Sequence, residues 1–257
     1  MSEDEPLFTP LDFISTLARA ANIPPKDVSI PKRIVLTYER GSYEYAKGLT
    51  GGKPLGWWVY ADANPPFCTG VYASTEVGVG ILWQGAPAAV MTLEEAIACG
   101  ATHIFEIGLA GSLQPDLKPG DIIVVTEAIR DEGTSLQYLP SETNVRASSD
   151  LRKQLVRCLK QRKIDHRVGK VWTTDGVYRE TRKKVERYRH AGILAVNMET
   201  SAIFALAKFR NVEAASAQVI SDVLSESGWS LLFRSEKIME RTKLLLETAL
   251  EALVATD

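Results

Sequence analysis

Short apolar runs of strand length recur along this chain, and in its second half they alternate with longer stretches of helical periodicity. The apolar runs predict strands at residues 33–38, 57–61, 67–74, 77–84, 103–108, 121–129, 170–175, 192–196 and 214–223. The helical patterns fall at residues 11–21, 86–100, 148–163, 181–191, 199–210 and 235–255. This order favours a mixed sheet covered by helices on both faces.

No repeat, low-complexity segment or linker rich in proline and serine divides the chain. We therefore expect one α/β domain over residues 1–257, in which residues 1–30 form an N-terminal extension.

Composition and charge narrow the class of protein. The chain is 45% hydrophobic and 24% charged, as in ordinary soluble domains, and its formal net charge of −2 favours neither nucleic acid nor a membrane surface. The three cysteines form no metal-binding or disulfide pattern, and the acidic start MSEDEPLFTP does not resemble a signal peptide. We expect a cytoplasmic protein without a metal ion, a nucleic-acid partner or a membrane span.

Two glycine-containing segments are candidate binding loops. The loop GLAGS begins at Gly108, at the end of a predicted core strand, where α/β sheets bind ligands and where glycine lets backbone N–H groups approach an anion. An ordinary turn explains the same glycines. In STEVGVG, Thr75 is placed either to bind a ligand hydroxyl or phosphate, or simply to end a strand.

The segment AVNMETSAIFALA places a single carboxylate, Glu199, in an apolar run at the predicted start of a helix. One explanation is that the acid complements the helix dipole, although Asn197 already suits the N-cap position. The other is a sugar site, in which Met198 packs on the ring and Glu199 accepts its hydroxyl protons. The residues alone leave both explanations open.

A second acid, Asp222 in VISDVLSES, also follows an apolar strand. It is either a turn aspartate or a general acid, and a general acid needs a pKa raised by burial. The basic cluster at residues 178–190 is predicted to be a solvated helix face.

Taken together, four segments of this sequence resemble the nucleoside phosphorylase family of the uridine and purine nucleoside phosphorylase type. They are IGLAGSLQPDLKPGDIIVVTEAIRDEGTS, VWTTDGVYRET, AVNMETSAIFALA and VISDVLSES. The resemblance implies a three-layer α/β/α fold around a twisted mixed sheet, and assembly into a homo-oligomer of two to six copies. It also implies cleavage of the N-glycosidic bond of a nucleoside, with inorganic phosphate as co-substrate and no cofactor.

The same resemblance implies roles for individual residues. Glu199 is expected to bind the ribose hydroxyls and Met198 to pack on the sugar, with Thr75 as a further ribose contact. Asp222 is expected to protonate the base, which favours a purine, and Val177 and Tyr178 to form the wall of the base site. Asp222 and Glu199 are thus the expected catalytic residues.

The phosphate site departs from the family pattern. Glu106 stands where the family has a phosphate-binding arginine, and Leu109 stands where it has a serine or threonine. Arg40, Thr75 and the backbone at Gly108 are the remaining candidates for a phosphate or nucleophile site. Phosphorolysis is the first hypothesis. The alternatives are a nucleosidase in which Glu39 or Glu76 activates water, and a non-catalytic nucleoside-binding homologue.

Overall fold

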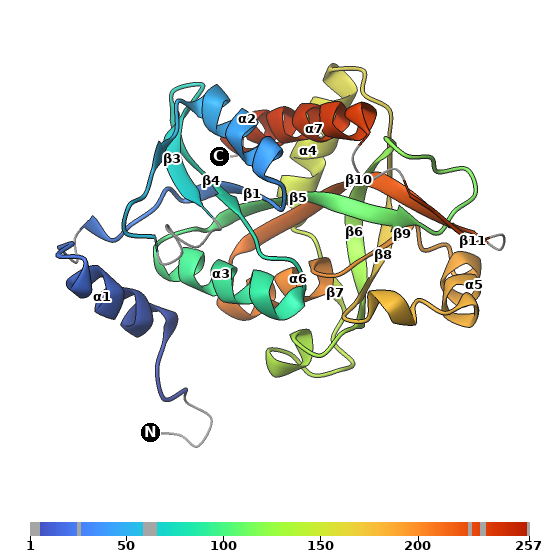
Figure 1. Ribbon diagram of the computed structural model, residues 1–257, viewed down its shortest axis with the longest axis horizontal. Coiled ribbons are helices and arrows are strands. Elements are labelled where there is room, and N and C mark those ends of the chain that lie inside the picture. Colours follow the sequence, from blue (N-terminus) through green and yellow to red (C-terminus); the bar gives the residue numbers. More distant parts are fainter. Residues whose placement is uncertain (1–5, 25–26, 59–65, 226–227, 232–234, 256–257) are drawn as a thin grey trace.

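One mixed sheet runs through the molecule in this computed structural model, which describes residues 6–24, 27–58, 66–225, 228–231 and 235–255 (Figure 1). The strands are β1 Arg33–Thr37, β2 Lys53–Pro54, β3 Phe67–Tyr72, β4 Thr75–Ile81, β5 His103–Ser112, β6 Ile122–Asp131, β7 Val145–Arg146, β8 His166–Thr174, β9 Ala195–Asn197, β10 Glu213–Ser225 and β11 Gly228–Leu231. The helices are α1 Pro10–Ala20, α2 Arg40–Thr50, α3 Ala86–Ala98, α4 Ser149–Gln161, α5 Arg182–His190, α6 Thr200–Arg210 and α7 Glu236–Val254.

The sheet is open at one end and closed at the other. Its strand order is β11-β10-β6-β8-β9-β5-β1-β4-β3-β2, with β7 paired to β6. Because β10 pairs with β5 as well as with β6, strands β10, β6, β8, β9 and β5 close into a ring. Strands β4, β1, β5 and β10 run parallel, so their carboxyl ends meet at one edge.

Helices cover both faces of this sheet. Helices α2, α4 and α7 lie on one face and α3 and α6 on the other, while α5 lies at the far end near β11 (Figure 1). Successive residues of β5 therefore enter opposite cores: Ile104 belongs to the core under α3 and α6, and Phe105 to the core under α4 and α7. This confirms the predicted three-layer mixed α/β fold.

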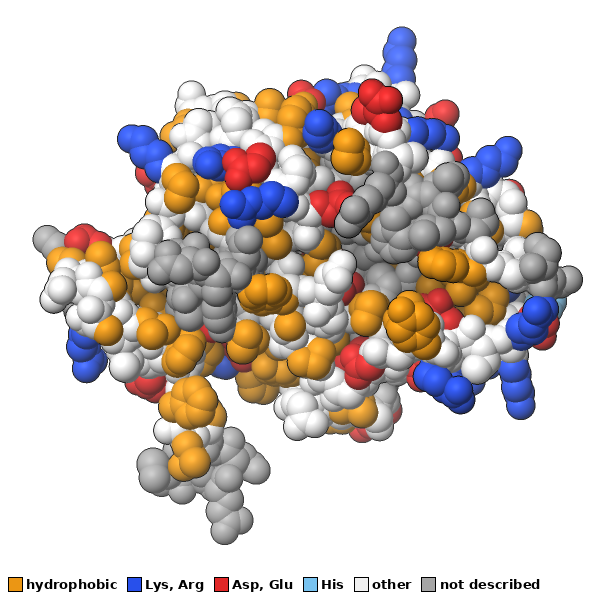
Figure 2. All heavy atoms as spheres, viewed as in Figure 1, with side chains coloured by type: hydrophobic (Ala, Val, Ile, Leu, Met, Phe, Trp, Pro, Cys, Tyr) orange, Lys and Arg blue, Asp and Glu red, His pale blue; other side chains and the backbone are white. Residues whose placement is uncertain are grey.

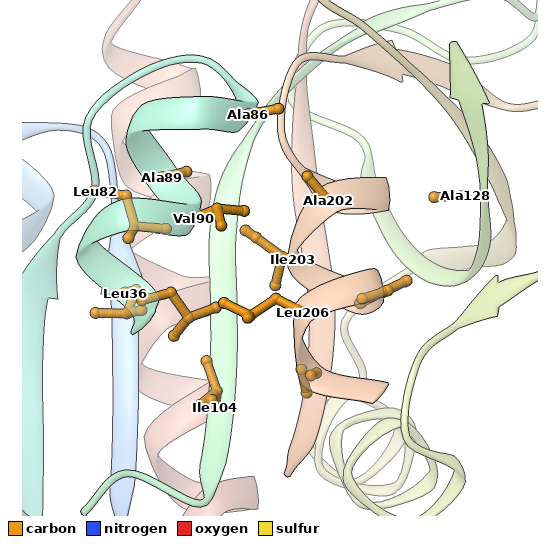
Figure 3. Close-up of a cluster of buried hydrophobic side chains, with 14 of the residues drawn as sticks. Leu36, Leu82, Ala86, Ala89, Val90, Ile104, Ala128, Ala202, Ile203 and Leu206 are labelled. Atoms are coloured by element: carbon orange, nitrogen blue, oxygen red, sulfur yellow. The ribbon is translucent and has the colours of Figure 1, made fainter. Parts of the chain in front are cut away.

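Residues 200–207 of helix α6 are buried on every side, which explains why its sequence shows little amphipathic pattern. Ala202, Ile203 and Leu206 are fully buried, and they pack with α3 residues such as Ala89 and Val90 (Figure 3). The small alanine side chains let the two helices approach closely, and burying a side chain such as Ile203 contributes about 1.5–3 kcal/mol. This packing fixes the start of α6, which carries Glu199.

Two predicted elements are corrected. Helix α2 was not expected, because Gly41 and Gly48 lower its helix propensity; it forms because Tyr43 and Ala46 are buried against the sheet. The predicted strand at 57–61 begins instead with a turn at residues 57–58, and its remaining residues lie outside the described part of the chain.

The predicted strand at 67–74 ends early, in a tight hairpin. Ala73 and Ser74 have φ values of 45° and 67°, and Tyr72 pairs with Thr75 across this two-residue turn. Thr75 is therefore the first residue of β4, at the edge of the sheet opposite to the carboxyl ends of the parallel strands.

Within the described ranges, no helix has both the length and the apolar character needed to cross a bilayer. The same residues include no group of three or more potential ligands placed to hold a metal ion. On the face shown in Figure 2, positive and negative side chains are interspersed.

Candidate functional site

The carboxyl ends of the parallel strands meet the start of α6. In the strand register Leu36 lies beside Glu106, and Gly108 lies beside Gln218. Glu199, which immediately precedes α6, reaches the loop after β4, where the backbone N–H of Gly85 donates to Glu199 Oε1 at 2.8 Å. Glu199 thus links the start of α6 to the loop after β4, which are 114 residues apart in the sequence.

Glu199 is a buried carboxyl group that does not cap its own helix. Its side chain is 7% exposed, and the backbone N–H of Met198 donates to Oε2 at 3.1 Å. Burial, followed by the negative charge of Glu106, raises the pKa of Glu199 to about 7, against the opposing effect of the two backbone donors. A carboxyl group with this pKa can exchange protons at neutral pH, which a helix cap does not require.

Below Glu199 lies a buried polar cluster formed by Tyr38, Glu106, Thr200, Ser216 and Gln218. Glu106 is 0% exposed; Tyr38 Oη donates to Glu106 Oε1 at 2.8 Å, and Thr200 Oγ1 donates to Oε2 at 2.9 Å. Burial raises the pKa of Glu106, while hydrogen bonds from hydroxyls of Ser216, Tyr38 and Thr200 act in the opposite direction. These donors are neutral, so the cluster satisfies the carboxylate without cancelling its charge.

Gly108 has a packing role in this cluster. A Cβ atom at this position would lie 3.0 Å from Cε2 of Tyr38, so a larger residue would displace the ring that donates to Glu106. Packing against Tyr38 therefore explains why glycine occupies position 108. The hypothesis that its backbone binds an anion remains a prediction.

Asp222 lies on β10, the strand beside β5, further toward the carboxyl end than Gly108. It pairs with Gly111, three residues beyond Gly108, which is a distance of about 10 Å along a strand. Asp222 is 7% exposed; Ser221 Oγ donates to Oδ1 at 2.6 Å and Trp229 Nε1 donates to Oδ2 at 2.8 Å. The sequence predicted a loop beginning at Gly108, but residues 108–112 are the last part of strand β5, because they pair with β10. Glu199 and Asp222 thus stand at the two ends of the segment 108–111, which we call the glycine segment of β5.

Glu180 is an ionisable residue of this region that the sequence did not reveal. It lines a cavity of about 170 Å³ together with Trp229, Leu224 and residues of α5. Burial, followed by the charge of Asp222, raises the pKa of Glu180 to about 7. In the sequence Glu180 stands in the basic segment 178–190 and looks like one more solvated charge; no periodicity marks it.

The expected base wall lies beside this cavity but is open to solvent. Val177 and Tyr178 form a short 3-10 helix after β8, and their side chains are 44% and 98% exposed. Their role as base contacts remains a prediction.

The structure does not bring every predicted residue to this edge. Thr75 and Glu76 lie at the start of β4, about 20 Å of strand before Ile81, so we remove Thr75 from the ribose and phosphate sites and Glu76 from the candidates for water activation.

Arg40 is at the correct edge, in the first turn of α2, with a side chain 59% exposed and its Nε 3.6 Å from Glu44 Oε1. Glu39 precedes it and accepts a hydrogen bond from Ser42 Oγ at 3.4 Å.

The partly closed mixed sheet and the buried acids at its carboxyl edge define an α/β protein with a candidate ligand site at the strand ends. The chain belongs to the Phosphorylase superfamily, whose family model matches residues 63–253. This confirms the family predicted from the four sequence segments.

Curated relatives include enzymes that act on purine nucleosides, as their names state. A guanosine phosphorylase of Halorubrum lacusprofundi is 27% identical over 179 residues, which cover 70% of this chain and 74% of the relative. A purine nucleoside phosphorylase of the DeoD type from Caldanaerobacter subterraneus is 30% identical over 189 residues, which cover 70% and 79%.

Solved structures agree on the fold. A uridine phosphorylase from Vibrio fischeri matches with a TM-score of 0.78 and 26% identity, covering 88% of this chain and 92% of its own. A purine nucleoside phosphorylase from Toxoplasma gondii in complex with immucillin-H matches with a TM-score of 0.79, covering 88% and 91%. At 20% identity this second match shows the fold alone.

Proposed function

We propose that this protein cleaves the N-glycosidic bond of a nucleoside. The observation that carries the proposal is Glu199, a buried carboxyl group with a pKa of about 7 at the carboxyl edge of the sheet. Each of its oxygens accepts one backbone N–H and keeps a further acceptor position, which suits the paired hydroxyls of a ribose. Met198 beside it is the proposed apolar contact of the sugar ring.

The charges near Glu199 suit the transition state of this reaction. Breaking the bond between C1′ and the base builds positive charge on the ribose, and the negative charges of Glu106 and Glu199 lie on the same side of the site. Because the Glu106 cluster is already formed, no reorganisation is needed as that charge develops.

We further propose that water is the nucleophile. An attacking phosphate would approach two carboxyl groups in a site where burial weakens solvent screening, and Glu106 is hydrogen-bonded by neutral hydroxyls alone within the described residues. Water carries no charge, and Glu199, with a pKa of about 7, is suited to accept its proton. The reaction then yields free ribose and free base.

Phosphorolysis is the second candidate, because the named relatives are phosphorylases and Arg40 lies at the same edge of the sheet. In that case the products are ribose 1-phosphate and free base, and Arg40 with backbone N–H groups near Gly108 binds the phosphate. Inorganic phosphate is then a co-substrate, and neither candidate requires a cofactor. A homo-oligomer of two to six copies remains a prediction from the resemblance, and a cytoplasmic location remains a prediction from the cysteines and the acidic start of the chain.

Base release from a panel of purine and pyrimidine nucleosides tests the proposal. The panel is run with and without inorganic phosphate, beside the variant Glu199→Ala and the exposed-site control Glu142→Ala. We expect release by wild type and by the control, and its loss in Glu199→Ala. Tight nucleoside binding without any release would indicate a non-catalytic homologue and would contradict the proposal.

A further inference from the structure

The two acids on the base side of the site differ in their hydrogen bonds. Both oxygens of Asp222 accept, one from the hydroxyl of Ser221 at 2.6 Å and the other from the indole N–H of Trp229 at 2.8 Å. An indole N–H can only donate, so the second oxygen of Asp222 is held as an acceptor. Asp222 is therefore poorly placed to present a proton to a ligand.

Glu180 has the opposite arrangement. Glu180 lines the 170 Å³ cavity that Trp229 also lines, and the indole of Trp229 is the group that donates to Asp222. Within the described part of the chain, no side-chain or backbone donor is hydrogen-bonded to this carboxyl group. A ligand in the cavity would meet Glu180 directly.

Charged groups of both signs surround the cavity, and Asp222 is the one whose charge acts on the pKa of Glu180. Asp222 faces it from β10, and Arg182, Glu186 and Arg189 line the cavity from α5. The guanidinium of Arg189 is engaged elsewhere, since it donates to the carbonyl oxygens of Leu113 at 2.8 Å and Leu224 at 2.9 Å.

The surroundings of Glu180 favour its protonated form. Burial and the neighbouring charge of Asp222 raise the pKa of Glu180 to about 7, so a large share of molecules carry the proton at neutral pH. A general acid works best when its pKa lies close to the working pH.

We propose that Glu180 is the general acid that protonates the leaving base, and that Asp222 is a positioning residue that keeps the proton on Glu180. This inference rests on the proposed N-glycosidic cleavage. It moves the acid role from Asp222, to which the sequence assigned it, to Glu180, which lines the same cavity as Trp229.

The proton balance of the step is complete. The C1′–N bond breaks, its electron pair goes to the base, and the proton of Glu180 passes to a nitrogen of that base. Water adds its oxygen to C1′ and gives one proton to Glu199. Exchange with solvent then removes the proton from Glu199 and restores the one on Glu180, so nucleoside and water become ribose and base.

Leaving-group dependence tests the assignment in the full-length protein. Glu180→Gln is compared with wild type and with Glu240→Gln, a control on the exposed face of α7. The substrates are a nucleoside cleaved by wild type and 4-nitrophenyl riboside, whose leaving group needs no proton. We expect Glu180→Gln to slow nucleoside cleavage by about 100-fold or more, and to change cleavage of the nitrophenyl riboside by less than about threefold.

The pH profile separates Glu180 from Asp222. In wild type the rate should fall as the pH rises through about 7, because Glu180 loses its proton. Burial is the larger cause of this raised pKa and the charge of Asp222 the smaller one, so Asp222→Asn should move the same limb part of the way to lower pH while activity persists. In Glu180→Gln the limb should disappear.

Each possible failure has its own meaning. If wild type releases no base from any nucleoside, the proposed function fails and the inference fails with it. If wild type is active and Glu180→Gln slows both substrates equally, or neither, then only the assignment of Glu180 is overturned. The same holds if Asp222→Asn removes the limb that Glu180→Gln retains.

Discussion

The two ends of the glycine segment between Gly108 and Gly111 in β5 are built in different ways. At the Gly108 end, Glu199 lies above a cluster in which Glu106 is fully buried and hydrogen-bonded through both oxygens. At the Gly111 end, Glu180 lines an open cavity and Tyr178 is 98% exposed. At the Gly108 end the polar groups are hydrogen-bonded within the protein, whereas the Gly111 end has a cavity that a ligand can occupy.

This difference matches what the two halves of a nucleoside require. The sugar is the same in every ribonucleoside, and the positive charge develops on it, so a preformed negative site serves it well. Bases differ in shape and in hydrogen bonding, and an acid that is free of hydrogen bonds can serve several of them. We therefore expect substitutions at the Gly108 end to affect every substrate, and those at the Gly111 end to depend on the leaving group.

The largest effect is expected from Glu199→Ala. The ribose diol loses a charged acceptor for two hydroxyls, at about 1.5–3 kcal/mol for each hydrogen bond, so kcat/KM should fall by roughly 100-fold to 10,000-fold. Steady-state kinetics on several nucleosides measure this. Near-wild-type turnover would show that Glu199 does not contact the substrate.

Glu199→Gln should change the pH dependence of stability. The pKa of Glu199 is raised from 4.5 to about 7 in the folded protein, so its stabilising contribution is complete below pH 4.5 and is lost as the pH rises through about 7. Glutamine is neutral at every pH. Relative to wild type, Glu199→Gln should therefore gain up to roughly 3 kcal/mol of unfolding free energy between pH 4.5 and pH 7.

Urea denaturation of both proteins at several pH values measures this difference. The gain should level off above pH 7, because Glu199 is then fully ionised in the folded wild type. A stability difference that does not vary with pH would mean that burial does not raise this pKa.

A smaller effect is expected from Glu106→Gln. The amide keeps the size of the side chain but removes the charge, so the pKa of Glu199 should fall toward its ordinary value. Because Glu199 must be ionised to accept a proton from water, the acidic limb of the rate profile should move to lower pH, by roughly one unit or less. A limb that stays in place would show that Glu106 does not act on Glu199.

The smallest effect is expected from Thr75→Ala. Thr75 is the first residue of β4, directly after a hairpin turn at the opposite edge of the sheet, so turnover and phosphate dependence should both remain within about twofold of wild type. A large loss of activity would mean that Thr75 reaches a site in a way that one copy of the chain does not show.

Much of the fold could be predicted from hydrophobic patterning. The runs at 103–108 and 121–129 are strands of the central sheet, because core strands buried on both faces are almost continuously apolar. Helix α2 escaped prediction because its two glycines hide a buried stripe whose partners, β3, β4 and α7, come later in the chain.

The site was only partly predictable, for reasons of topology. Glu199, Asp222 and the anomalous Glu106 are visible because each interrupts or ends an apolar run. Thr75 was misplaced because the hairpin at Ala73 reverses the chain, and this turn sets which edge of the sheet a residue occupies. Glu180 could not be found, because its environment is created by Asp222 and Trp229, which follow some forty residues later.

The central claim is that water attacks the sugar at the Glu106 end of the site. Phosphorus-31 NMR of a reaction with a cleaved nucleoside in excess phosphate tests it directly, because ribose 1-phosphate has a resonance distinct from that of inorganic phosphate. We predict free base with the phosphate signal unchanged, and an equal rate when phosphate is omitted. A growing ribose 1-phosphate signal that matches base release would contradict this account and establish phosphorolysis.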